Sequence, residues 1–188
     1  RRGDPMVLNM DEGVRAGTTV ESLAKLRPVF DREGAVTAGN ASTLNDGASA
    51  VLIAEASFAK AQGWEVIATI EDYVTSGVEP ARVMSAPIPA VQSLLKRNNL
   101  NVLDVDVYEH NEAFASASCA VAQEVGIPDD RFNLHGGAVS LGHPLGASGT
   151  RCLITMLGVM RRLDASSGIV TLCLGGGNAV AMYVRRPQ

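Results

Sequence analysis

The alternation of strand-like and helix-like segments beyond residue 64 is the feature that most limits the fold. Short apolar runs are typical of buried strands, and amphipathic stretches are typical of helices. We predict strands at 65–73, 105–110, 168–173 and 179–184, and helices at 88–98, 112–125 and 148–163. This alternation predicts a layered α/β domain with a mixed, mostly parallel sheet flanked by helices and an antiparallel pair at one edge.

The first 63 residues follow a different pattern. The first forty are polar and punctuated by glycines, with a short predicted helix at 19–26. An apolar run at 48–54 predicts a buried strand, and 55–62 predicts a helix that ends at Gly63. Because a buried strand needs neighbours, these residues cannot form a core alone. We therefore place a domain boundary between 1–63 and 64–188.

Composition and charge argue against several functions. The chain has sixteen Lys and Arg against twenty Asp and Glu, without a basic run, so we expect no nucleic-acid partner. The best apolar run, 180–184, is far shorter than the roughly 20 residues of a membrane span, so we expect no membrane contact. The three cysteines lack the spacing of a metal knuckle or a disulfide framework. That usage favours a reducing compartment, and we expect a cytoplasmic protein without a metal.

Three short segments each place one reactive side chain beside small residues. They are His-Asn-Glu-Ala-Phe at 110–114, Gly-His-Pro-Leu-Gly at 142–146 and Cys-Leu-Gly-Gly-Gly at 173–177. Each follows a predicted strand end or opens a predicted helix. Ligands of α/β sheets collect beyond the carboxyl ends of the strands. The pattern therefore predicts that Asn111, His143 and Cys173 share one pocket.

Each of these residues also has a purely structural interpretation. A lone histidine such as His143 more often caps a helix, and an Asn-Glu pair such as Asn111-Glu112 is typical of capping. Cys173 is equally compatible with a packed thiol at a strand end and with a nucleophile or base beside the backbone N–H groups of an oxyanion hole. The presence of all three residues in one predicted pocket favours a catalytic role over the structural interpretations. Cys119 and Cys152 lie within helical patterns and are predicted to belong to the core.

These motifs resemble those of the thiolase family, most closely the acetyl-CoA C-acetyltransferase type. The run at 133–149, Asn-Leu-His-Gly-Gly-Ala-Val-Ser-Leu-Gly-His-Pro-Leu-Gly-Ala-Ser-Gly, resembles the thiolase histidine signature, and 111–115 and 173–177 resemble the family's Asn and second-cysteine motifs. The similarity is to the later half of a thiolase. It implies a thiolase-like layered fold, C-terminal half only. Residues 1–63 would be the end of the CoA-handling loop region with the last strand and helix of the N-terminal domain, and 64–188 the C-terminal domain.

The resemblance also implies roles for individual residues. The family joins two acetyl-CoA molecules to acetoacetyl-CoA and CoA, reversibly, through an acyl-cysteine, and that nucleophilic cysteine belongs to the half that this sequence does not match. His143 would activate that cysteine, Asn111 would hold the water that completes an oxyanion site with His143, and Cys173 would move the proton. Gly175 would donate its N–H to a second oxyanion site. CoA would lie along Arg15, Ser22, Phe30 and Ser42.

The resemblance further implies an acyltransferase of fatty acid metabolism with no cofactor, since CoA thioesters are its substrates. We expect a missing N-terminal half as partner, a homodimer or homotetramer at full length, and no activity from this piece alone. Two alternatives stay open: a degradative thiolase for longer 3-oxoacyl-CoA chains, and a non-catalytic, CoA-binding scaffold with a thiolase-like fold.

Overall fold

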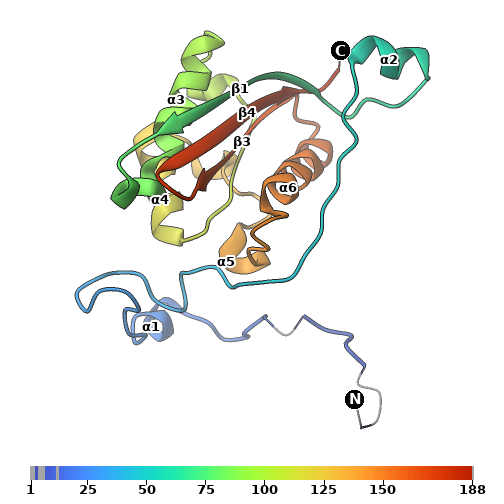
Figure 1. The fold of residues 1–188 in the computed structure, drawn as a ribbon. Coiled ribbons are helices and arrows are strands. Elements are labelled where there is room, and N and C mark those ends of the chain that lie inside the picture. The colour runs from blue at the N-terminus through green and yellow to red at the C-terminus, as the bar shows by residue number, and fades with distance from the viewer. Residues whose placement is uncertain (1–2, 4–6, 12, 188) are drawn as a thin grey trace.

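The computed structural model describes residue 3, residues 7–11 and residues 13–187 (Figure 1). Residues before 69 run as largely irregular chain interrupted by two short helices, and the layered domain begins at the first strand. The helices and strands are, in chain order, α1 (Val20–Leu23), α2 (Ala56–Ala61), β1 (Thr69–Gly77), η1 (Pro80–Ser85), α3 (Pro87–Arg97), η2 (Val102–Asp104), β2 (Val107–His110), α4 (Ala115–Val125), η3 (Asp129–Arg131), α5 (Ala138–Leu141), α6 (Ser148–Leu163), β3 (Ser167–Leu174) and β4 (Asn178–Arg185).

The strands form one sheet in the order β1-β4-β3-β2. Strands β2 and β3 are parallel, whereas β4 is antiparallel to both β3 and β1. The predicted mixed sheet flanked by helices is confirmed, but the predicted excess of parallel pairs is wrong. The reason is the short turn at Gly175–Gly177, which returns the chain beside β3 as a hairpin and thereby dictates an antiparallel β4.

Helices cover both faces of this sheet (Figure 1), with α3 and α4 on one face and α6 on the other. Successive strand residues point to opposite faces, so Ile169 packs toward α3 while its neighbour Val170 packs toward α6. Burial on both faces explains why β3 and β4 read as largely apolar runs, whereas the edge strand β1 is more polar and mostly exposed. Gly168 leaves room for α6, because a Cβ there would lie 2.7 Å from the sulfur of Met156.

The predicted strand at 48–54 is wrong. The segment is extended, but no strand of the described chain pairs with it. Its side chains face outward, with Leu52 80% and Ile53 65% exposed. An apolar run becomes a strand only where another strand supplies hydrogen-bond partners.

Two smaller expectations also changed. The helix predicted at 19–26 is the single turn α1, which begins at a capping box between Thr19 and Ser22. The core assignment of Cys119 is wrong, because this cysteine is exposed on α4. Cys152 is buried on α6, as predicted. In the described ranges, no helix has the length and apolar character needed to cross a membrane.

Leu94 anchors α3 to the sheet and offers a direct test of this core. It is fully buried in the cluster that contains Ile169 and Tyr183. Replacing it by alanine should lower the free energy of unfolding by about 2–5 kcal/mol, because transfer energy is lost and a cavity remains. Urea unfolding measures this change. Ser93→Ala, an exposed position on the same helix, is the control and should stay within about 0.5 kcal/mol of the parent. An equally small effect of Leu94→Ala would contradict this packing.

Candidate active site

Two of the predicted motifs meet at one edge of the sheet. Because β2 and β3 are parallel, their carboxyl ends lie at the same edge. His110 at the end of β2 is in register with Thr171, and the backbone N–H of Asn111 donates to the carbonyl of Thr171 at 3.2 Å. Cys173 lies two residues further along β3, about 7 Å on at the usual rise of a strand.

A loop between α5 and α6 brings His143 to Asn111. The amide nitrogen of Asn111 lies 3.3 Å from Nε2 and 3.5 Å from Nδ1 of the imidazole. The backbone N–H of His143 donates to the carbonyl of Thr43 and to Oδ1 of Asn45, both at 3.1 Å. Gly142 precedes His143 with φ +88°, a left-handed conformation that favours glycine. The structure therefore places the imidazole and the amide side by side.

The hydrogen bonds around His143 fit the tautomer that carries its proton on Nδ1. The hydroxyl of Ser148, the first residue of α6, donates to the carbonyl of Pro144 at 2.9 Å. That hydroxyl has one proton, so it accepts from Nδ1 of His143 at 2.6 Å. Nε2 is then the unprotonated nitrogen, and it is the ring nitrogen slightly closer to the Asn111 amide nitrogen. Partial burial and the nearby charge of Arg151 lower the pKa of His143, which keeps the imidazole neutral near pH 7 and able to accept a proton.

The orientation of the Asn111 amide follows from its neighbours on α6. Arg151 donates from Nη2 to Oδ1 of Asn111 at 2.9 Å, and the thiol of Cys152 approaches the same oxygen at 3.5 Å. A guanidinium has no acceptor, so the amide atom that it contacts must be the oxygen. The NH₂ group of Asn111 therefore points toward His143. Asn111 itself is 1% exposed.

Glu109 is a buried carboxyl group behind these residues. It lies in β2, is fully buried, and accepts from Nη1 of Arg151 at 3.3 Å. Burial raises the pKa of Glu109 to about 8, against the lowering effect of Arg151. Glu109, Arg151 and Ser148 are not among the site residues that the motifs predict. For Glu109 a signal was available in the sequence, because an acidic residue inside a buried strand needs a partner.

Cys173 lies near the end of β3 and is half-buried. Its thiol is 3.9 Å from the sulfur of Met84, and burial raises its pKa, so the resting group is a protonated thiol. The hydrogen bonds of the described residues do not link it to Asn111 or His143. Gly175 follows in open space, with nothing within 4 Å of where a Cβ would be. Gly177 has φ +91°, and a side chain there would collide with the carbonyl of Val78.

The residues expected to contact CoA lie in the irregular segment. Phe30 is 77% exposed and packs edge-to-face against Phe114, with ring centroids 5.9 Å apart. The backbone N–H of Ser42 donates to the carbonyl of Ala113 at 3.0 Å, so both residues lie beside the Asn111 motif. Arg15 is exposed, whereas the hydroxyl of Ser22 already accepts from and donates to Thr19.

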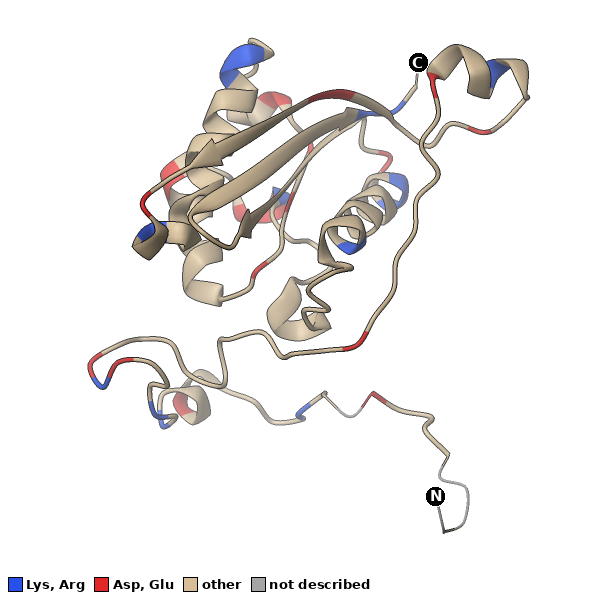
Figure 2. Cartoon of the chain, in the orientation of Figure 1, with Lys and Arg blue, Asp and Glu red and all other residues tan. Residues whose placement is uncertain are grey.

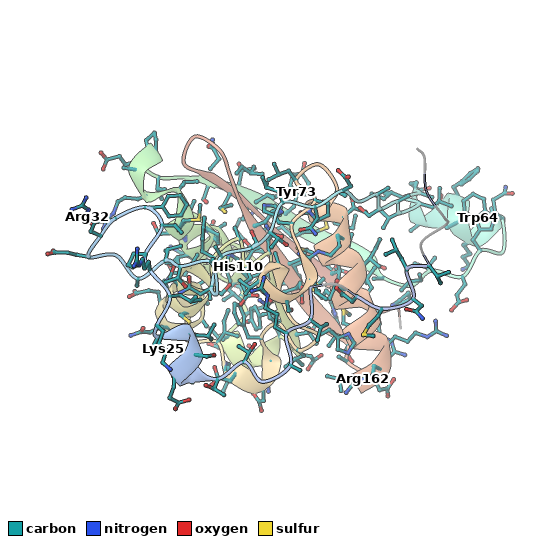
Figure 3. All side chains as sticks on the ribbon, turned by 90° about the horizontal axis from the view of Figure 1, so that it is seen from below. Lys25, Arg32, Trp64, Tyr73, His110 and Arg162 are labelled. Carbon is teal, nitrogen blue, oxygen red and sulfur yellow. The ribbon has the colours of Figure 1, made fainter. Side chains whose placement is uncertain are left out.

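The other histidines and most of the charged residues do not belong to the Asn111–His143 pair. His110 lies in the interior (Figure 3), with Nδ1 2.7 Å from Ser118 Oγ, and burial lowers its pKa to about 4. Figure 3 places Lys25 and Arg32 at the margin of the molecule. Figure 2 shows Lys and Arg interspersed with Asp and Glu over the drawn elements. Within residues 3, 7–11 and 13–187, no group of three or more His, Cys, Asp or Glu is placed to hold a metal ion.

Comparison with known families agrees with this geometry. The family described as "Thiolase, C-terminal domain" matches residues 64–186, and "Thiolase, N-terminal domain" matches residues 1–57. The chain therefore belongs to the thiolase family. The acetyl-CoA acetyltransferase of Pseudomonas aeruginosa is 50% identical over 186 residues, which are 99% of this chain and 47% of that protein. A probable acetyl-CoA acyltransferase of Staphylococcus epidermidis is 46% identical over 187 residues, again 99% and 47%.

Solved structures show the same fold. The Bacillus anthracis acetyl-CoA acetyltransferase superposes with a TM-score of 0.90 at 38% identity, covering 94% of this chain and 45% of that chain. Human mitochondrial 3-ketoacyl-CoA thiolase in complex with CoA gives a TM-score of 0.86 at 37% identity, covering 96% and 46%. The chain thus spans about half the length of the relatives that it matches, and the thiolase-like layered fold is confirmed.

Proposed function

We propose that this chain is the later part of a thiolase that joins two acetyl-CoA molecules to acetoacetyl-CoA and CoA, and catalyses the reverse cleavage. The observation that carries the proposal is the amide of Asn111 beside the neutral imidazole of His143 at the carboxyl edge of β2. The two groups offer a base and a hydrogen-bond donor to one small volume. The names of the relatives support the same chemistry.

In the first stage, Nε2 of His143 takes the proton of a cysteine supplied by the other half of the enzyme. The sulfur attacks the thioester carbonyl, the C–S bond to CoA breaks, and an acyl-cysteine forms. The leaving CoA sulfur is protonated by Cys173, which rests as a thiol because burial raises its pKa. The N–H of Gly175, in open space after β3, donates to the oxygen of the tetrahedral intermediate.

In the second stage, the Cys173 thiolate left by the first stage takes an α-proton from a second acetyl-CoA. The resulting enolate oxygen needs preorganised donors, which are the Nε2–H that His143 gained in the first stage and a water held by the Asn111 amide, each worth about 3–4 kcal/mol. The enolate carbon then attacks the acyl-cysteine, the C–S bond breaks, and the released cysteine sulfur takes back its proton from Nε2 of His143. Phe30 and Ser42, with Arg15 and Ser22 further along, would line the path of CoA, and no resident cofactor is required. We expect a cytoplasmic homodimer or homotetramer.

The test uses the protein encoded by the complete gene that contains this chain. Purified protein should cleave acetoacetyl-CoA in the presence of CoA faster than it cleaves a long-chain 3-oxoacyl-CoA. The isolated 188 residues should be inactive, because none of the three cysteines is assigned as the acyl carrier. Preference for the long chain would identify the degradative alternative. CoA binding without turnover of either substrate would overturn the proposal in favour of the scaffold.

A further inference from the structure

We propose that Arg151 is a positioning residue that fixes which end of the Asn111 amide faces His143. The inference rests on the proposed function of Asn111 and adds a residue that acts through it. A carboxamide can present either its oxygen or its NH₂ group in the same volume, with almost the same shape. Only the NH₂ orientation donates a hydrogen bond to a water or an enolate oxygen. Something outside the amide must therefore select that orientation.

The contacts of Arg151 make that selection. Nη2 lies 2.9 Å from Oδ1 of Asn111, and the Cys152 thiol approaches the same oxygen at 3.5 Å. Rotating the amide by half a turn would set its NH₂ group against the guanidinium donors. The same rotation would turn the oxygen toward Nε2 of His143, which has a lone pair and no proton in this tautomer. The flipped amide would lose its partners on both sides.

Glu109 and the backbone of α6 hold Arg151 in place. Nη1 is 3.3 Å from Oε1 of Glu109, which is fully buried in β2, and the Arg151 side chain is only 18% exposed. Arg151 lies three residues after Ser148 on α6, so both project from the same side of the helix. Ser148 fixes the imidazole and Arg151 fixes the amide. One helix end therefore sets the relative orientation of the two groups.

A double-mutant cycle in the complete protein tests this role. We expect Asn111→Ala to lower kcat for acetoacetyl-CoA thiolysis about 100- to 1000-fold, as for loss of an oxyanion donor. Arg151→Met should lower kcat about 10- to 100-fold, with a much smaller change in KM, because the donor is misplaced rather than removed. In the Asn111→Ala background, Arg151→Met should have almost no further effect. Arg161→Met, an exposed arginine on the same helix, is the matched control and should match the parent.

A second variant separates a loss of folding stability from a loss of the positioning role of Arg151. Arg151→Met alone leaves the Glu109 carboxyl buried without its partner, which is destabilising. Glu109→Gln combined with Arg151→Met replaces that unpartnered carboxyl by a neutral amide and should melt closer to the parent while keeping the same loss of kcat. Wild-type kcat in this double variant, or losses that multiply with Asn111→Ala, would refute the role of Arg151. A near-normal kcat for Asn111→Ala alone would instead refute the proposed function of Asn111.

Discussion

Replacing Cys173 by alanine in the complete protein is expected to abolish exchange of the α-protons of acetyl-CoA with solvent while acyl-enzyme still forms. The proton-transfer group is lost, and general bases contribute about 100- to 10,000-fold. Acylation should fall much less, because a CoA thiolate can leave without being protonated in the same step. Trapping labelled acetyl-enzyme and following deuterium uptake into acetyl-CoA on the same sample measures both stages.

The exposed Cys119 provides the matched control for that experiment. Cys119→Ala removes a thiol from the same domain and should leave both stages unchanged. If Cys173→Ala prevents acylation altogether, or exchanges protons at the normal rate, its assigned role is wrong. The packed thiol against Met84 would then be the better interpretation of this residue.

His143→Ala should impair both stages together, each by about 100-fold or more. The imidazole is the base that would activate the nucleophile, and it is one of the two donors to the enolate oxygen. The same pair of assays measures both stages. It therefore distinguishes His143→Ala, which impairs both, from Cys173→Ala, which mainly abolishes proton exchange. His135→Ala is the control, because His135 is exposed and its Nε2 contacts Arg162 at 3.0 Å. Loss of one stage alone would contradict the shared role of His143.

The fold was predictable where periodicity and burial agree. Helix α6 has the bounds 148–163 that its apolar face predicts, and it ends where Asp164 adopts φ +55°. Strands β3 and β4 begin and end within one residue of their predicted ranges. The pairing directions were not predictable in the same way, because β1 meets β4 across a hundred residues of chain. The run at 48–54 has the residue pattern of a strand. A strand also needs a neighbouring strand to pair with, and the local pattern does not show whether one is present.

The candidate site was predictable at the level of motifs and not of contacts. Asn111 and His143 stand out because glycines or a helix start surround them, and the structure brings their side chains together. Ser148 and Arg151 look like ordinary residues of an amphipathic helix. Their function depends on which neighbours the fold places opposite them, and local spacing does not encode that. Whether Cys173 acts with this pair stays a prediction for the assays above.

Helix α6 also links the chemistry to a residue at the far end of β3. Gly168 lies near the beginning of that strand, where a Cβ would lie 2.7 Å from the sulfur of Met156 and 3.0 Å from that of Met160, so these side chains on α6 would have to move. If the helix moved with them, the imidazole and the amide would be misaligned together, although Gly168 touches neither. Selection for activity should therefore act on this interior glycine as well as on the reacting groups. Part of the domain's core would then accept substitutions about as rarely as its active site does.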